Sequence, residues 1–515
     1  MPPGKVLFYT VRTVTTTRRK LLQAGAAAFA APAQVTSRKS SRPHVLLLMA
    51  DQMRGDCLGA DGNRVIRTPH LDRIAAEGVR FRCAYSSTPT CTPARTALLT
   101  GLSPWNHGML QMISMAPRYP FEKPRAMRDA GYYTAIIGKN HYTAQRNTHG
   151  YQFALLDESG RVESPDFRSD YRSWFSSVAP NLDPDATGLG WNDYRARPYA
   201  LPEKLHPTAW IGQTAVTFLE TYSRPEPFFL KVSFERPHSP YDPPERFWKM
   251  YENAALPSAQ VGKWAARYAP RSDSSNDIWH GDMGEAVVRN SRQGYYGSIS
   301  FVDEQIGRIL ETLEKRRLLD ETLVLFIADH GDMTGDQNLW RKSYAYEPSA
   351  RVPFLMRWPT GLISSERGRV LREVVELRDV LPTLLDAAQV TSHPPLDGRS
   401  LLALVDGKAS GWRSWLDLEH GVCYSPRNHW NALTDGREKY IYHAYDGAEQ
   451  FFDLDKDPAE RNDLASDAAA NSRMAAWRNR LVEHLAPRGE EWVRNGRLIP
   501  RPQNMPSSPN FPAAR

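Results

Sequence analysis

The stretch His44-Val45-Leu46-Leu47-Leu48-Met49-Ala50 runs straight into the polar pair Asp51-Gln52, and this transition decides which kind of fold the chain forms. A short, almost continuous apolar run without alternation predicts a strand that is buried on both faces, as in parallel sheets covered by helices. In open α/β sheets, functional sites form just past the carboxyl ends of such strands. The first strand therefore predicts both a fold class and the edge of the sheet where a site lies.

Three further segments repeat the pattern of a buried strand that ends at polar residues. They are residues 132–137 before Lys139, residues 228–234 before His238, and residues 323–328 before Asp329-His330. With helical segments in the intervals, they predict an α/β fold with a large mixed, mostly parallel sheet flanked by helices. We expect the polar residues after the four strands to meet at one edge.

The chain divides into segments of different texture. We interpret residues 42–410 as the catalytic domain and the polar stretch 151–205 as an insertion over its site. Residues 411–490 change to short alternating runs followed by a helix, which predicts a smaller α+β domain with antiparallel strands and no direct role in chemistry. The Pro- and Ser-rich tail, residues 497–515, predicts disorder.

Composition narrows the function classes. Hydrophobic residues make up 41% and charged residues 24% of the 515 residues, which is typical of a globular protein. No apolar run of about 18 residues occurs, so we expect no membrane span. The net charge of +7 is concentrated at the start of the chain, so bulk charge gives no support for binding nucleic acid. Four cysteines without a CxxC pair exclude a disulfide scaffold and a zinc–thiolate site.

The first 33 residues contain five Lys or Arg residues and no acid. Arg18-Arg19-Lys20 is a twin-arginine pattern, a small weakly apolar stretch follows, and Ala31-Pro32-Ala33 fits a cleavage site for small residues. These features predict an export signal over residues 1–33 that directs the chain to the bacterial periplasm by the twin-arginine route. The alternative is a basic tail without a targeting role.

The segment Cys91-Thr92-Pro93-Ala94-Arg95 combines a nucleophile with a helix start. Pro93 suits the first turn of a helix, and a cysteine at a helix N-terminus near an arginine lies in positive potential. An isolated cysteine is ordinarily a buried structural residue. Here the Cys-x-Pro-x-Arg pattern is followed by Leu98-Leu99-Thr100-Gly101, and together they resemble the sulfatase family, within the alkaline phosphatase superfamily.

The resemblance covers about residues 42–464 and implies an alkaline phosphatase-like fold. It also implies that a formylglycine-generating enzyme oxidises Cys91 to formylglycine, whose hydrate supplies the nucleophilic oxygen. Arg95 would hold that nucleophile. A sulfated small molecule or glycan is then the expected substrate.

The two strand-end pairs Asp51-Gln52 and Asp329-His330 offer hard ligands for a divalent cation. A single strand-end Asp is more often a helix cap than a ligand. The resemblance implies that these four residues and Cys91 share one ion, with calcium as first choice and manganese or magnesium as alternatives. Gln52 and His330 depart from the Asp-Asp and Asp-Asn pairs that are more common in the family.

The remaining roles also come from the resemblance. In the Gly-Lys-x-His motif, Lys139 would neutralise sulfate oxygens and His141 would hold or deprotonate the formylglycine hydroxyl. His238, in a Pro-His-x-Pro element, and Lys342 would contact the substrate and stabilise or protonate the leaving oxygen. Asn106 would contact the substrate, whereas the adjacent His107 is at least as well explained as a core residue.

These residues predict an arylsulfatase-like sulfuric ester hydrolase that works through a covalent sulfoenzyme intermediate, with Asp329 as the expected base for the nucleophile. The alternative is a phosphonate monoester or phosphodiester hydrolase of the same superfamily. Lys139 favours sulfate, because it can hold the additional terminal oxygen that a sulfate ester has and a diester lacks. A third interpretation, a catalytically inactive carbohydrate-binding relative, requires a lost nucleophile or ligand, and every motif position is occupied.

Overall fold

The computed structural model describes residues 42–158, 160–162 and 167–512. The predicted export signal, residues 1–33, lies outside the described residues. Within them, no helix is long and apolar enough to cross a membrane.

A central sheet of eight strands has the order β5-β4-β6-β1-β7-β8-β2-β9. Its strands are β1 (His44–Asp51), β2 (Val79–Phe81), β4 (Tyr133–Gly138), β5 (Phe153–Leu156), β6 (Phe228–Pro237), β7 (Thr322–Ala328), β8 (Phe354–Arg357) and β9 (Arg369–Leu371). β5, β4, β6, β1 and β7 run parallel, while β8 is antiparallel to both of its neighbours. This confirms the predicted mixed, mostly parallel sheet.

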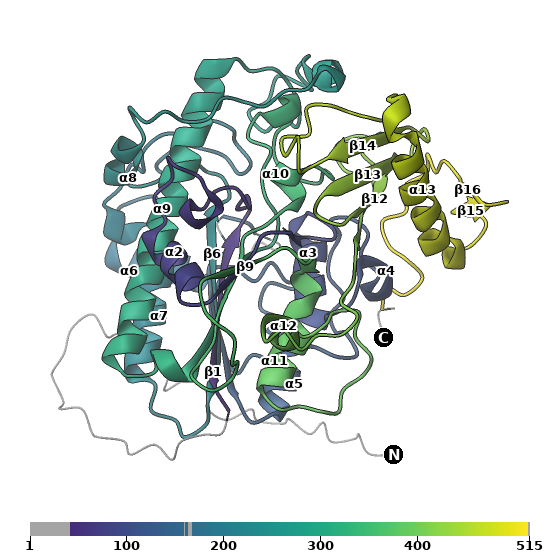
Figure 1. Ribbon diagram of the computed structural model, residues 1–515. Coiled ribbons are helices and arrows are strands. Elements are labelled where there is room, and N and C mark those ends of the chain that lie inside the picture. Colours follow the sequence, from purple (N-terminus) through teal and green to yellow (C-terminus); the bar gives the residue numbers. More distant parts are fainter. Residues whose placement is uncertain (1–41, 159, 163–166, 513–515) are drawn as a thin grey trace, which may run out of the picture.

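Helices cover both faces of this sheet (Figure 1). One side carries α2 (Pro69–Ala76), α6 (Asp170–Val178), α7 (Pro207–Thr221), α8 (Glu245–Met250) and α9 (Glu285–Lys315). The other side carries α3 (Cys91–Thr100), α5 (Lys123–Asp129), α11 (Val380–Ala387) and α12 (Leu401–Val405). The shorter helices α4 (Pro104–His107) and α10 (Glu347–Ala350), and a two-stranded pair of β3 (Ala84–Tyr85) and β10 (Val375–Glu376), complete this part of the chain.

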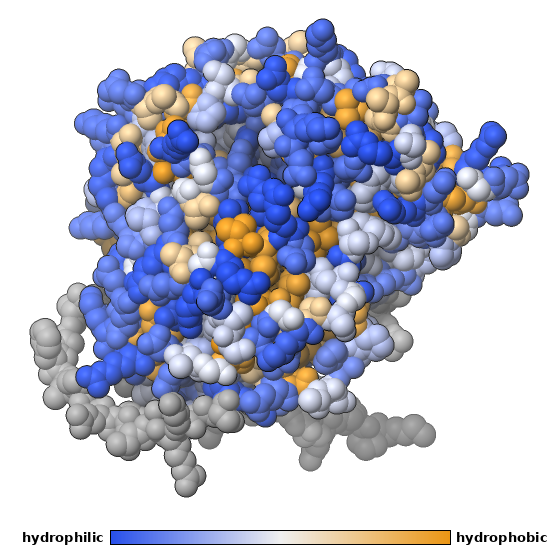
Figure 2. All heavy atoms as spheres, viewed as in Figure 1, coloured by the Kyte–Doolittle hydropathy of each residue, from blue (hydrophilic) through white to orange (hydrophobic). Residues whose placement is uncertain are grey.

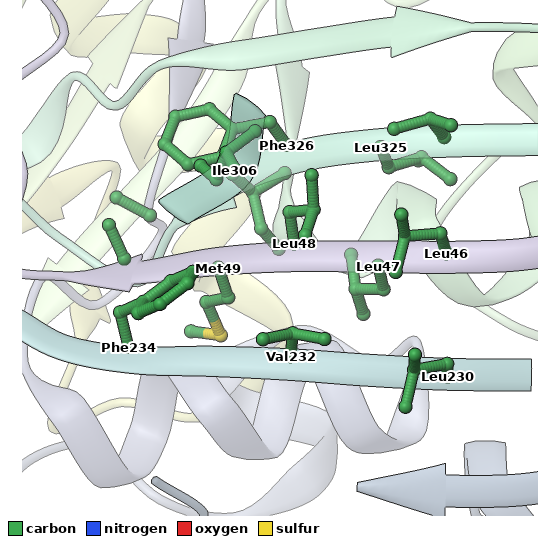
Figure 3. Packing of buried hydrophobic residues seen from close by; sticks show 14 of the residues in the cluster. Leu46, Leu47, Leu48, Met49, Leu230, Val232, Phe234, Ile306, Leu325 and Phe326 are labelled. Carbon is green, nitrogen blue, oxygen red and sulfur yellow. The ribbon is translucent and has the colours of Figure 1, made fainter. Parts of the chain in front are cut away.

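The core explains why the first strand is so apolar. β1 lies between β6 and β7, so that Val45 pairs with Phe229 on one side and Leu323 on the other. Figure 3 shows side chains of these three strands packed together, with Ile306 of α9 among them. Because both faces of β1 are covered, polar side chains are accommodated only past its end, which is where Asp51 and Gln52 lie.

The interpretation of residues 151–205 as an insertion is wrong for their first part. Phe153–Leu156 forms β5, an edge strand of the main sheet paired with β4. The run is too short to stand out from its polar surroundings in the sequence. The rest of the stretch contains α6 and an irregular segment that reaches the site described below.

The C-terminal part forms a second sheet with the order β11-β12-β13-β14, antiparallel throughout. Its strands are β11 (Leu416–His420), β12 (Trp430–Thr434), β13 (Glu438–His443) and β14 (Glu449–Asp453). The helix α13 (Asn471–Leu485) packs on it through Trp477 and Leu481, which join Tyr440 in one apolar cluster. The predicted smaller α+β domain is confirmed. A short hairpin of β15 (Val493–Arg494) and β16 (Arg497–Leu498) follows.

The prediction of disorder from residue 497 is wrong for the part of the tail that the structure describes. Ser508 N–H donates to Gly108 O at 2.9 Å, and Ser508 Oγ–H donates to Trp105 O at 2.6 Å. Gly108 has φ 89°, and a Cβ there would collide with Phe511. The tail thus has fixed backbone partners on a distant segment, which its Pro- and Ser-rich composition does not reveal.

The surface in Figure 2 is mostly hydrophilic on the face shown, with a small apolar patch near its centre. Val370 of β9, 49% exposed, is one of the few large apolar side chains exposed among the described residues. Scattered exposure of this kind is ordinary for a globular protein.

Candidate active site

The residues predicted after the four buried strands meet at one edge of the sheet. Asp51 ends β1, Lys139 follows β4, His238 follows β6, and Asp329-His330 follow β7. β4, β6, β1 and β7 are consecutive parallel neighbours in the sheet, so their carboxyl ends lie side by side. All these side chains are buried.

Cys91 is the first residue of α3, and extended Thr90 precedes it as the N-cap. Its Sγ lies 3.1 Å from His330 Nε2, while His330 Nδ1 donates to Gly331 O at 2.9 Å. Burial opposes charge on the thiol, but the positive charges of Lys342 and His330 outweigh it and lower the pKa of Cys91. Residue 91 therefore lies in a positive potential that favours an anion.

Arg95 lies one turn after Cys91 and is fully buried. Its guanidinium donates to Asp329 Oδ2 at 2.8 Å, to Asp51 Oδ2 at 3.0 Å and to Lys139 O at 2.9 Å. One side chain therefore ties the ends of β1, β4 and β7 to the helix that carries residue 91. It also neutralises part of the charge of two facing carboxylates.

Asp51, Cys91, Asp329 and His330 each offer a ligand atom, and these atoms all lie within 4.8 Å of one another. Asp51 Oδ1 is buried and accepts no hydrogen bond from a described residue. Two carboxylates around an orphaned oxygen fit a divalent cation. Gln52 lies beside the group, but its amide oxygen accepts from Lys342 Nζ at 2.6 Å and its amide nitrogen contacts Asp332.

Two lysines provide the positive charge of the site. Lys139 Nζ forms an ion pair with Asp51 Oδ2 at 2.5 Å. Lys342 Nζ lies 2.7 Å from His238 Nε2. His238 Nδ1 donates to Ser239 O at 2.9 Å, so Nε2 is free to accept from the lysine. Burial, followed by Lys342 and Lys139, holds the pKa of His238 well below its usual range.

The loop that carries Lys139 and His141 is fixed by Glu158, a residue that sequence reasoning missed. The backbone N–H groups of Asn140 and His141 both donate to Glu158 Oε1 at 2.9 Å. His141 Nδ1 has no partner among the described residues, and burial lowers the pKa of His141 well below its usual value. Glu158 comes just past β5, so the strand-end pattern would have pointed to it had the strand been recognised.

Trp191 and Asn192 also escaped the sequence analysis. The Trp191 ring stacks on His238 with centroids 4.0 Å apart, and Lys139 Nζ lies 4.5 Å from its centre. Asn192 Oδ1 lies 3.4 Å from Lys342 Nζ. This part of the 151–205 stretch does lie against the site, as the sequence predicts. No spacing or motif marks either residue.

The structure does not bring Asn106 to this group, which corrects its predicted role in substrate binding. Asn106 lies exposed on α4, and its amide donates to both carboxylate oxygens of Asp397, at 3.0 and 2.8 Å. His107 is buried, and burial lowers its pKa to about 3, as fits a neutral core residue. The motif around Asn106 contacts Asp397 and the C-terminal tail instead of the site.

The smaller domain, for which the sequence predicts no direct role in chemistry, reaches the N-terminus of α3. Thr90 Oγ1 lies 2.6 Å from both His420 Nε2 and Ser343 Oγ, and His420 Nδ1 donates to Gly421 O at 2.6 Å. With Nδ1 as donor, the directions follow: Ser343 donates to Thr90, and Thr90 donates to His420. Burial lowers the pKa of His420 to about 4, which keeps it the neutral acceptor. These hydrogen bonds join His420 of β11 to the N-cap of α3 and to Ser343, the residue after Lys342.

Comparison with known proteins places this geometry among relatives. Residues 43–390 match the family described as Sulfatase, and residues 335–486 match the one described as N-sulphoglucosamine sulphohydrolase, C-terminal. The chain is 37% identical over 475 residues to an arylsulfatase from Clostridium perfringens, covering 89% of this chain and 97% of that protein. It is 30% identical to a choline-sulfatase from Rhizobium meliloti, covering 86% and 87%.

Among solved structures, the phosphonate monoester hydrolase of Agrobacterium radiobacter superposes with a TM-score of 0.71 at 26% identity, covering 87% of this chain and 96% of that one. A relative with this fold is thus named for a phosphonate ester, while the sequence relatives above are named for sulfate esters.

Proposed function

The chain belongs to the sulfatase family and is a sulfuric ester hydrolase, and we propose that its nucleophile is a formylglycine made from Cys91 by a formylglycine-generating enzyme. The observation that carries this is the place of Cys91 at the start of α3, against His330 and one turn before Arg95. A cysteine side chain there is surrounded by groups that suit an oxyanion.

The residues divide the reaction between them. One hydroxyl of the formylglycine hydrate gives its proton to Asp329 and attacks sulfur, and the sulfur–oxygen bond to the alcohol breaks. Lys342 supplies a proton to the leaving oxygen, and His238, whose Nε2 lies 2.7 Å from Lys342 Nζ, positions the lysine. The second hydroxyl of the covalent sulfate ester then loses its proton, with His141 as the acceptor. Sulfate leaves with the electron pair of the carbon–oxygen bond, and the aldehyde adds water to restore the hydrate.

We propose that Asp51, Asp329, His330 and residue 91 hold one divalent cation, with Gln52 beside them. Calcium is the first choice because most of the donors are hard oxygens, and manganese or magnesium are the alternatives. When bound, the ion supplies Lewis-acid charge for the sulfate oxygens and the nucleophile. Arg95 orients both carboxylates toward it.

Hydrolysis of p-nitrophenyl sulfate by protein co-expressed with a formylglycine-generating enzyme tests this function. Bis-p-nitrophenyl phosphate tests the second candidate, a phosphonate monoester or phosphodiester hydrolase. Two observations favour that candidate. The pairs Asp51-Gln52 and Asp329-His330 depart from those more common among sulfatases, and the fold resembles that of a phosphonate monoester hydrolase. Faster turnover of the diester would reverse the order of the two candidates.

Lys139→Ala should reduce hydrolysis of the sulfate monoester about tenfold more than hydrolysis of the diester. A lysine at about 4 Å attracts a unit charge by roughly 4 kcal/mol at an effective dielectric near 20, much of which desolvation offsets. Both rates will fall, because Lys139 also pairs with Asp51, so the ratio of the two kcat/KM values is the measurement. Lys139→Arg, which keeps the charge, is the control. Equal losses on both substrates would contradict the assigned role.

Thr90→Val should lower kcat about tenfold or more while KM changes little. Valine keeps the shape of Thr90 but breaks the chain from Ser343 to His420, and small misplacements of reacting groups cost large factors in rate. Thr90→Ser keeps the hydroxyl and should restore most of the rate. Because Thr90 adjoins the modified residue, each rate is divided by the formylglycine fraction measured by mass spectrometry. Equal losses in both variants would argue against a positioning role.

We further propose that the protein is exported to the bacterial periplasm by the twin-arginine route. The support is the Arg18-Arg19-Lys20 pattern with its small-residue cleavage site. Cell fractionation tests this, with an Arg18→Lys, Arg19→Lys double variant retained in the cytoplasm as the expected result.

A further inference from the structure

A cavity of about 490 Å³ opens beside the groups that would bind the leaving oxygen. Trp191 lines it, and the same Trp191 ring stacks on His238. Arg236 and Pro240, which flank His238 in sequence, line it as well. The cavity therefore adjoins His238 through the Trp191 ring and through the two residues that flank the histidine.

Two buried carboxyl groups, Asp157 and Glu235, line this cavity and hydrogen-bond to each other. Asp157 follows β5 and Glu235 lies on β6, and both are fully buried. Apart from the hydrogen bond between the two groups, neither oxygen of Asp157 nor Oε2 of Glu235 accepts from a donor among the described residues. Burial, followed by the neighbouring Glu235, raises the pKa of Asp157 well above its usual range, so one proton is shared between the two groups. Buried acceptors without donors are rare and costly in folded proteins.

The guanidinium groups beside this pair are already engaged. Arg236 donates to Asp242 at 2.8 Å and to the other oxygen of Glu235 at 3.0 Å. Arg172 donates to Asp185 at 2.7 Å. With one proton shared between Asp157 and Glu235, one oxygen of Asp157 is left without a donor, and a bound group that brings a donor would satisfy it.

Aromatic side chains form part of the wall. Besides Trp191, Tyr171 and Tyr199 line the cavity, and both of their hydroxyls donate to Leu205 O, at 2.8 and 3.4 Å. Aromatic walls above a carboxyl floor suit a ring that carries hydroxyl groups on its edge.

We propose that this cavity is the subsite for the alcohol half of the sulfate ester, and that it takes a polar ring bearing hydrogen-bond donors, such as a sugar. The inference rests on the proposed function and specifies its substrate class. An aryl or alkyl ring without donors would fill the same space but leave the remaining oxygen of Asp157 unsatisfied. Sites built to hydrogen-bond a substrate discriminate strongly against analogues that lack the donor.

The test compares two esters of the same shape: glucose sulfated on its primary hydroxyl, and cyclohexylmethyl sulfate, which has the ring without hydroxyls. The wild-type kcat/KM for the sugar ester should exceed that for cyclohexylmethyl sulfate by about tenfold or more. Asp157→Leu should reduce that ratio about tenfold or more, because it removes the acceptor that only the sugar ester uses. Asp157→Asn, which keeps one acceptor oxygen, should fall between the two and covers the case in which the leucine variant does not fold.

The control is Glu203→Gln, which removes an exposed carboxylate paired with Arg246 outside this cavity and should leave the ratio unchanged. Glucosamine sulfated at the same position separates the two kinds of donor: a further Asp157-dependent gain assigns the donor to an ammonium, and no gain assigns it to hydroxyls. A wild-type preference for cyclohexylmethyl sulfate, or a ratio that Asp157→Leu does not change, would overturn the subsite. Absence of p-nitrophenyl sulfate hydrolysis would instead refute the proposed function itself.

Discussion

Cys91→Ser should abolish steady-state hydrolysis of p-nitrophenyl sulfate, by at least about 10⁴-fold, and leave the enzyme trapped after a single turnover. A serine hydroxyl at the start of α3 occupies the place of the nucleophile and attacks sulfur. The resulting ester has no second hydroxyl on its carbon, so sulfate cannot be eliminated. Intact-protein mass spectrometry after incubation with substrate should show the mass of one added SO₃ group.

The matched control is Cys83→Ser, because Cys83 is also a buried free cysteine but lies against Gly436, away from the site. It should retain wild-type turnover. In the wild-type enzyme, the tryptic peptide from Cys83 to Arg95 should carry formylglycine at position 91. Full activity in protein whose residue 91 is an unmodified thiol would contradict the formylglycine mechanism.

Asp51→Asn and Asp329→Asn should each lose the divalent cation and about 10³-fold or more of kcat/KM. Each change removes a hard anionic ligand and one of the charges that hold the ion. Asparagine is chosen over alanine because its oxygen can still accept from Arg95, which would otherwise be left as a partly unpaired buried charge at a cost of about 3–5 kcal/mol. Elemental analysis of purified protein is the measurement.

Near-stoichiometric calcium in the wild type would support the first choice of metal, and manganese the second. Asp303→Asn serves as the control for a buried carboxylate elsewhere, because Asp303 accepts backbone N–H groups at the start of α2 and should keep both metal and activity. A chelated, metal-free wild type with full activity would show that the four-residue group is purely structural.

The sheet and the inner part of the site could be predicted because each depends on local sequence. The β1 run from His44 is apolar on both faces, so the polar residues that follow it must lie at the carboxyl end of the strand. The same logic finds Lys139, His238 and Asp329 at the ends of their strands. The polar residues that follow a buried strand can therefore be predicted without knowing which strands are neighbours.

The outer part of the site depends on contacts between distant segments, and these leave no local pattern. Trp191 reaches His238 from an irregular stretch, and His420 reaches Thr90 from the second sheet. Asn106 shows the reverse error, since a family-like motif turned out to bond Asp397 away from the site. Packing partners that are far apart in the sequence are set by the whole fold, so none of these cases could be decided from spacing.

The order of strands in the sheet also determines when, during translation, the surroundings of Cys91 can form. Leu323 pairs with Val45 across the centre of the sheet, and β7 is translated about 230 residues after Cys91. At about 5–20 residues per second, roughly ten to fifty seconds pass before the wall of the site that carries Asp329 and His330 exists. Cys91 is 1% exposed once that wall is in place. Any enzyme that oxidises this cysteine must therefore reach it on the growing or unfolded chain, and slower translation between α3 and β7 should raise the fraction of molecules that become active.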